Sequence, residues 1–71
     1  MVKFINGEIV VAAMNRNLTV FDVNLEILKQ FDGTDDEPVS MSGNETFIAV
    51  GDTTGVVRYY ERDGDEKPQV R

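Results

Sequence analysis

Apolar and β-branched residues come in short runs along the chain, and polar turn residues separate these runs. Short runs of this kind, bounded by Gly, Asn, Asp or Ser, predict β-strands. Asn6-Gly7, between the first two runs, is a dipeptide that strongly favours a two-residue hairpin turn. The pattern therefore predicts a series of antiparallel strands, at residues 1–5, 8–13, 18–23, 39–42, 46–51, 56–61 and 69–71.

The run at residues 8–13, EIVVAA, is almost continuously apolar and includes three β-branched residues. A strand with one face in solvent alternates apolar and polar residues, whereas a strand with both faces covered is apolar throughout. We therefore expect this strand to be central in its sheet and covered on both faces.

Residues 24–31, NLEILKQF, fit two structures. The apolar residues share one face if the segment is a helix, with Asn24 as N-cap and Gly33 near a C-terminal cap. The same residues fit an edge strand, and a helix of eight residues is marginal without strong packing. The alternatives are an all-β fold and a small α+β domain with a helix at about residues 24–32.

The order of these signals occurs twice along the chain. Two segments of the first half align with two of the second at one offset, 11–13 with 50–52 and 18–22 with 57–61. An offset of about forty residues is expected of a four-stranded β-propeller blade. The repeat favours a strand at 24–31 and divides the chain into a first blade-like repeat, 1–33, and a second, 34–71.

The stretch AVGDTTGVVRYYE, at residues 49–61, resembles the second and third strands of a WD-repeat blade. In that family a small residue and a Gly end one strand, a polar turn follows, and the next strand closes on an aromatic-acidic pair. Ala49, Gly51 and Tyr60-Glu61 match these positions, and Phe21-Asp22 is the equivalent pair of the first repeat. The chain has neither Trp nor His, so it departs from the family's His, Trp and Asp side-chain network.

The resemblance implies an all-β fold of two four-stranded antiparallel propeller blades that are part of a larger β-propeller. Closed propellers have about four to eight blades. Two blades would therefore need further blades from the same protein, from copies of the chain or from another chain. The resemblance also implies a protein-protein interaction scaffold that has no catalytic residues.

Composition and charge narrow the chemistry. The chain has no His and no Cys, so the commonest general base, the commonest metal ligand and a thiolate nucleophile are missing. We therefore expect no enzyme activity, no cofactor and no metal centre.

The net charge of −6 disfavours nucleic acid and anionic membranes, and it favours protein partners with basic surfaces. Because no apolar run approaches the ~20 residues that span a bilayer, we expect a cytoplasmic protein.

Five residues are candidates for partner binding: Arg58, Tyr59, Asp35, Asp36 and Glu37. Arg58 suits a partner's carboxylate or a local acid such as Asp52 or Glu61. Tyr59 and Tyr60 are neighbours in one strand, so we expect them on opposite faces of the sheet. The acidic residues crowd the loop at 32–37, but their spacing differs from that of a calcium loop, so a solvated loop is expected.

Three classes of function fit these features. The first is an interaction scaffold that presents acidic loops to partners. The second is a structural or engineered two-blade module that assembles with copies of itself into a closed propeller. The third is a small-ligand binder or carboxylate enzyme on an α+β fold, which a helix at residues 24–32 would favour.

Overall fold

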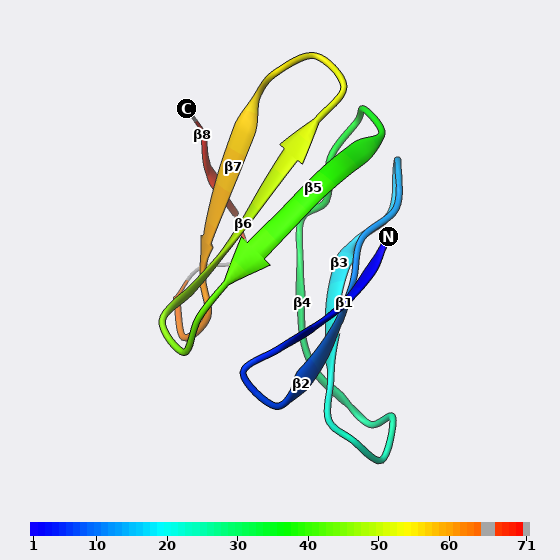
Figure 1. The fold of residues 1–71 in the computed structure, drawn as a ribbon, viewed down its shortest axis with the longest axis vertical. Helices are drawn as coiled ribbons and strands as arrows, with labels where there is room; N and C mark the ends of the chain where they lie inside the picture. The colour runs from blue at the N-terminus through cyan, green and yellow to red at the C-terminus, as the bar shows by residue number, and fades with distance from the viewer. Residues whose placement is uncertain (65–66, 71) are drawn as a thin grey trace.

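The computed structural model describes residues 1–64 and 67–70, and no helix occurs in this part of the chain (Figure 1). Residues 65, 66 and 71, which belong to the second predicted repeat, lie outside the described residues, so the last residue of the strand expected at 69–71 does too. The strands are β1 (Val2–Ile5), β2 (Glu8–Val11), β3 (Leu18–Phe21), β4 (Ile27–Phe31), β5 (Pro38–Gly43), β6 (Phe47–Asp52), β7 (Val57–Glu61) and β8 (Gln69–Val70).

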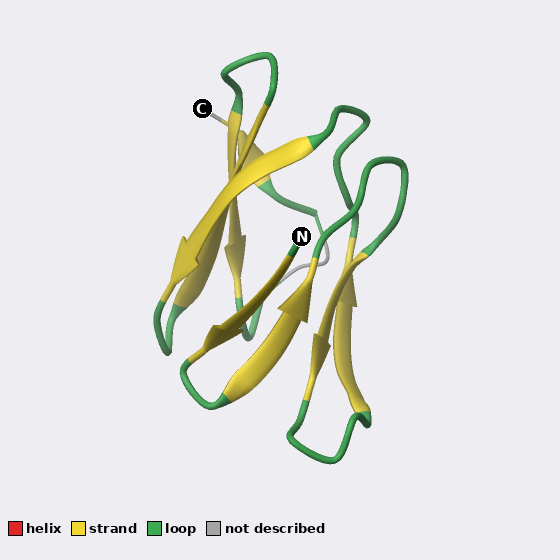
Figure 2. Ribbon diagram, turned by 45° about the vertical axis from the view of Figure 1, so that its right-hand side comes forward, coloured by secondary structure: helices red, strands yellow, loops and turns green. Residues whose placement is uncertain are grey.

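The strands form two antiparallel sheets, which lie side by side in Figure 2. The first has the order β1-β2-β3-β4, and the second has the order β5-β6-β7-β8, in which β8 contributes two residues. Each strand therefore pairs with the next one along the chain, as expected for short turns. The predicted all-β class is confirmed.

The local turn chemistry explains why the first hairpin forms. Asn6 and Gly7 have φ angles of 51° and 81°, the left-handed conformations that a type I′ turn requires. Their turn places Ile5 opposite Glu8 and fixes the register of β1 against β2. The predicted hairpin is confirmed.

The alternative of a helix at residues 24–32 is wrong, because β4 occupies most of this segment and pairs with β3. The Asp22 carboxylate accepts hydrogen bonds from the backbone N–H groups of Asn24 and Glu26, at 2.8 and 3.0 Å. These bonds hold a turn in which Leu25 has a φ of 65°, a left-handed conformation that a helix cannot contain. The turn therefore directs the chain back along β3.

The two sheets repeat one register. Phe4 lies opposite Ile9 in the first sheet, and Gly43 lies opposite Ile48 in the second, so the residue numbers differ by 39. The same difference relates the next ladders, in which Ile9 pairs with Phe21 and Ile48 with Tyr60. We call two residues equivalent when they are related by this difference of 39.

The sheets pack against each other through one face each, which we call the inner faces, and their buried side chains form one core. Phe31 of β4 and Tyr60 of β7 meet at this junction with ring centroids 5.3 Å apart. The core contains Ile5, Val10, Ala12, Leu18, Val20 and Phe31 from the first half and Met41, Ile48, Val50 and Tyr60 from the second.

The sheets stack front to back. Val20 is buried on the inner face of the first sheet, but its equivalent, Tyr59, lies on the opposite, outer face of the second. Conversely, Tyr60 is buried on the inner face of the second sheet, and its equivalent, Phe21, lies on the outer face of the first. Equivalent residues thus point the same way, and each sheet keeps one outer face that the described residues do not cover.

Candidate functional site

The structure separates Arg58 and Tyr59, the two candidates on β7. Arg58 lies opposite Val50, whose side chain is buried on the inner face, whereas Tyr59 lies opposite Ala49 on the outer face. Tyr60 is fully buried, so the expectation that Tyr59 and Tyr60 face opposite ways is confirmed. Arg58 and Tyr59 do not share one surface.

Asp52 holds Arg58 in place. Its buried carboxylate lies 2.6 Å from Nη1 of Arg58 and accepts hydrogen bonds from the Thr54 hydroxyl and from the N–H groups of Thr54 and Val56. These donors, the Thr54 hydroxyl foremost, outweigh desolvation and lower the pKa of Asp52 to about 2. Of the two local acids expected for Arg58, Asp52 is therefore its partner.

The acidic candidates Asp35, Asp36 and Glu37 lie in the loop that joins β4 to β5. Asp35 and Glu37 are exposed, and Asp36 is half-buried. The loop is tied down through its backbone, because the buried Thr34 donates its hydroxyl to the Asp36 carbonyl and Thr53 donates its N–H to the Glu37 carbonyl. Within the described residues, no group of three or more carboxylates could hold a metal ion.

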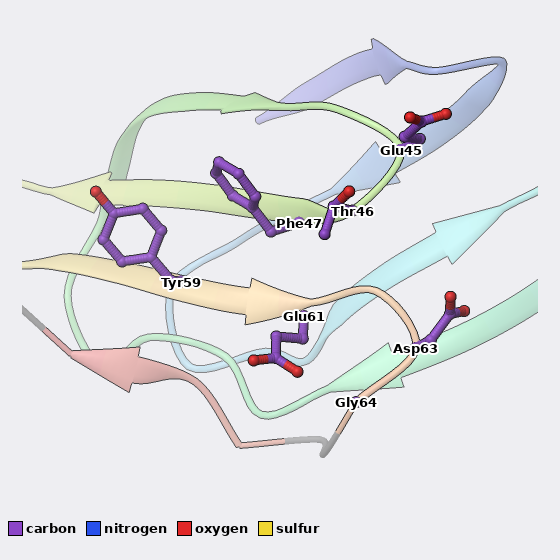
Figure 3. A pocket seen from close by; sticks show the side chains of 7 residues that line it. All are labelled: Glu45, Thr46, Phe47, Tyr59, Glu61, Asp63 and Gly64. Atoms are coloured by element: carbon purple, nitrogen blue, oxygen red, sulfur yellow. The ribbon is translucent and has the colours of Figure 1, made fainter.

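Tyr59 lines a pocket of about 480 Å³ on the outer face of the second sheet. Its ring lies beside that of Phe47, with centroids 5.8 Å apart (Figure 3). The turn before β6 adds Glu45 and the turn after β7 adds Asp63, both at the same end of these strands, and β7 adds Glu61. The pocket thus has an aromatic floor and an acidic rim.

The outer face of the first sheet carries a row of four apolar side chains, one from each strand. The row is continuous because Phe4 pairs with Ile9, Ile9 with Phe21, and Phe21 with Ile27. Phe4 is 64% exposed and Ile27 is 59% exposed, whereas the two central residues are half-buried. A second pair, Val2 and Val11, continues the apolar surface along β1 and β2.

The expectation that the strand at 8–13 is covered on both faces is wrong for the chain by itself. Val10 is fully buried, but Ile9 and Val11 point to the outer face and are half-buried. The sequence of β2 is typical of a strand between two layers, and the part of the chain that the structure describes supplies one of these layers. This is the main unexplained feature of the molecule.

Apart from Tyr59, the residues of the two outer faces, Phe47 and Phe4 among them, were not among the candidates from the sequence. The continuous apolar run of β2 was the available signal for the first sheet. For the second, Phe47 and Tyr59 are twelve residues apart, and the register of β6 against β7 brings them together.

In the described part of the chain, no helix is long and apolar enough to cross a membrane. Comparison of the chain with protein-family models, curated proteins and solved structures finds no match.

Proposed function

We propose that the chain is a non-catalytic protein-interaction module, a WD-like pair of blades that contributes to a larger β-propeller. One observation carries this proposal: the outer face of the first sheet consists of the positions that the second sheet buries. Ile9 and Phe21 are equivalent to Ile48 and Tyr60, which are fully buried against the first sheet. A face built from such residues is a face for packing against another protein layer.

The apolar face is a better contact surface than the acidic loop. Apolar burial provides most of the free energy of protein association, at about 25 cal/mol per Å². The loop with Asp35, Asp36 and Glu37 joins the two sheets, and its exposed carboxylates would contribute mainly to the rate and orientation of encounter with a basic surface. Partner binding is therefore assigned to the outer face, with the acidic loop in a steering role.

A non-catalytic role fits the side-chain inventory, because the chain has no His and no Cys. A cytoplasmic location is part of the proposal, since a chain without Cys suits a reducing compartment. The ligand-binding or enzymatic alternative depended on a helix at 24–32, and β4 occupies that segment.

Site-specific photocrosslinking tests the proposal. A benzophenone side chain at Phe4 is expected to form protein adducts in cell extract, whereas the same group at Met14, an exposed turn residue away from the sheet face, is not. Adding Ile27→Lys should abolish the adducts at Phe4, because it places a charge in the apolar row. A folded chain that forms no adducts from Phe4 would rule out this face as a contact surface.

A further inference from the structure

The junction between the two sheets contains a specific contact between a turn and a sheet face. The turn that follows β7 places Arg62 against Glu8 of the first sheet, and the two side chains form an ion pair. Lys29 of β4 donates hydrogen bonds to the carbonyl groups of Arg62 and Gly64 in the same turn. The turn at residues 62–64 is therefore seated on the inner face of the first sheet.

The first sheet has an equivalent turn, at residues 23–25, and nothing in the described chain seats it. The N–H of Leu25 donates to the Asp22 carbonyl, just as the N–H of Gly64 donates to the Glu61 carbonyl. Val23 is thus the equivalent of Arg62. Val23 and Leu25 are each 68% exposed, so the turn presents two apolar side chains to solvent.

The receiving surface also has an equivalent, and it is the pocket on the outer face of the second sheet. Phe47 is equivalent to Glu8, and Tyr59 is equivalent to Val20, so the pocket occupies the place at which the first sheet receives a turn. Figure 3 shows both aromatic side chains on this face. The pocket lies on the outer face, which is the side that the next layer would contact.

The residue types change together at these equivalent positions. Within the chain, a cationic side chain meets an acidic one, Arg62 against Glu8. At the outer faces, both positions are apolar, Val23 on the turn and Phe47 in the pocket. Each turn therefore matches one receiving site in polarity: the turn with Arg62 matches Glu8, and the turn with Val23 matches Phe47. If Val23 faced Glu8 instead, its apolar side chain would lie against a carboxylate and would lose its apolar contacts.

We propose that a second copy of this chain stacks on the first in the same front-to-back manner, with its Val23 turn seated in the Phe47–Tyr59 pocket. This rests on the proposed function, because it names the partner that covers the outer face of the first sheet. The interface is heterologous, so each added copy presents the same free face, and the assembly continues until a ring closes. The outer faces of both sheets are buried in such a ring.

Light scattering with matched variants of Val23 tests the stacking. The wild-type chain is expected to have a mass of a discrete multiple of 8.0 kDa, and Val23→Asp is expected to reduce it to a single chain. The new carboxylate would lie among Glu45, Glu61 and Asp63 and would lack a partner. Val23→Ile should keep the assembly, and Met14→Asp, an equal change of charge at the far end of β3, should leave the mass unchanged.

Disulfide crosslinking tests the geometry, because the chain has no cysteine of its own. Neither the Val23→Cys variant nor the Phe47→Cys variant should form a disulfide-linked dimer when it is oxidised alone. When the two variants are mixed and oxidised, a disulfide should join one chain of each. Met14→Cys mixed with Phe47→Cys should not. A monomeric wild type at all concentrations, or a dimer of Phe4→Cys with itself, would overturn front-to-back stacking.

The two proposals can fail separately. If the benzophenone at Phe4 captures a different protein while the cysteine pair does not crosslink, the interaction module stands and the second copy is excluded as its partner. If neither reaction occurs, both proposals are wrong.

Discussion

Phe31 and Tyr60 meet across the two sheets in a T-shaped arrangement, with an angle of 64° between their ring planes. Both side chains are almost completely excluded from solvent, and they are among the largest buried groups in the chain. An edge-to-face pair of this kind adds about 0.5–1.5 kcal/mol to the free energy gained from burying its area. The contact therefore makes each sheet depend on the other.

Replacing Phe31 by Ala should lower the free energy of unfolding by about 3–5 kcal/mol, because it opens a cavity at the junction. For a chain of 71 residues, such a loss is a large part of the total stability. Urea titration followed by circular dichroism measures the effect. Met14→Ala, at an exposed turn, is the control and should change the free energy by less than about 0.5 kcal/mol.

Tyr60→Phe should stabilise the protein. The Tyr60 hydroxyl is buried and has no hydrogen-bond partner among the described residues, and an unsatisfied buried group costs about 1–3 kcal/mol. The substitution keeps the ring and its contact with Phe31, so a rise of about 1 kcal/mol is expected in urea titration. A clear loss of stability would mean that the hydroxyl is bonded in the folded protein.

Tyr60 should also make the free energy of unfolding depend on alkaline pH. Burial raises the pKa of Tyr60 above its ordinary value of 10.0. The neutral form is therefore favoured in the folded chain, and stability that is present below pH 10 should fall as the pH rises above it. Stability measured in this range should fall less steeply in Tyr60→Phe than in the wild type.

Local chemistry makes much of the fold predictable from the sequence. Asn6-Gly7 specifies a hairpin by its own φ angles, and the alternation of residues separates Tyr59 from Tyr60. Which of the two tyrosines is inner depends on the neighbouring sheet, so a single strand does not reveal it. The segment at 24–31 was ambiguous because the Asp22 turn and the irregular pairing between β3 and β4 disguise the period of a strand.

The candidate site was less predictable, because the register between paired strands creates it. Phe47 and Tyr59 become neighbours through the register of β6 against β7. The continuous apolar run of β2 did carry information on the apolar outer face of the first sheet. This run indicated a strand that is covered on both faces. We propose that a partner layer covers the outer face, which the described residues leave exposed.

Asp52 should make the protein sensitive to acid. Its pKa is lowered from 3.8 to about 2 in the folded chain, so the folded state favours the ionised form. The resulting stability is present above pH 4 and should be lost as the pH falls from about 4 to about 2. Urea midpoints across this range should fall more steeply in the wild type than in Asp52→Asn, while Asp35→Asn, at an exposed position, should follow the wild type.

Gly33→Ala should destabilise the chain by about 1–3 kcal/mol, as expected for overpacking. A Cβ atom at this position would overlap the backbone carbonyl of Arg16, which cannot move without shifting the turn that precedes β3. Gly51→Ala is the matched control, because its Cβ would meet the Ser40 hydroxyl, which can rotate away. Thermal unfolding of the two variants should therefore show the larger loss for Gly33→Ala, and equal losses would contradict a close approach at Gly33.

The ion pair between Glu8 and Arg62 should contribute to holding the sheets together. Arg62 is the more buried partner, with 9% of its side chain exposed against 30% for Glu8, so solvent screens the pair incompletely. A double-mutant cycle with Glu8→Gln and Arg62→Gln should give a coupling energy of about 1 kcal/mol, which decreases as salt is added. A coupling near zero at low salt would show that the turn at 62–64 is seated by Lys29 and by packing. Val23 and Phe47 would then not take the place of a stabilising pair.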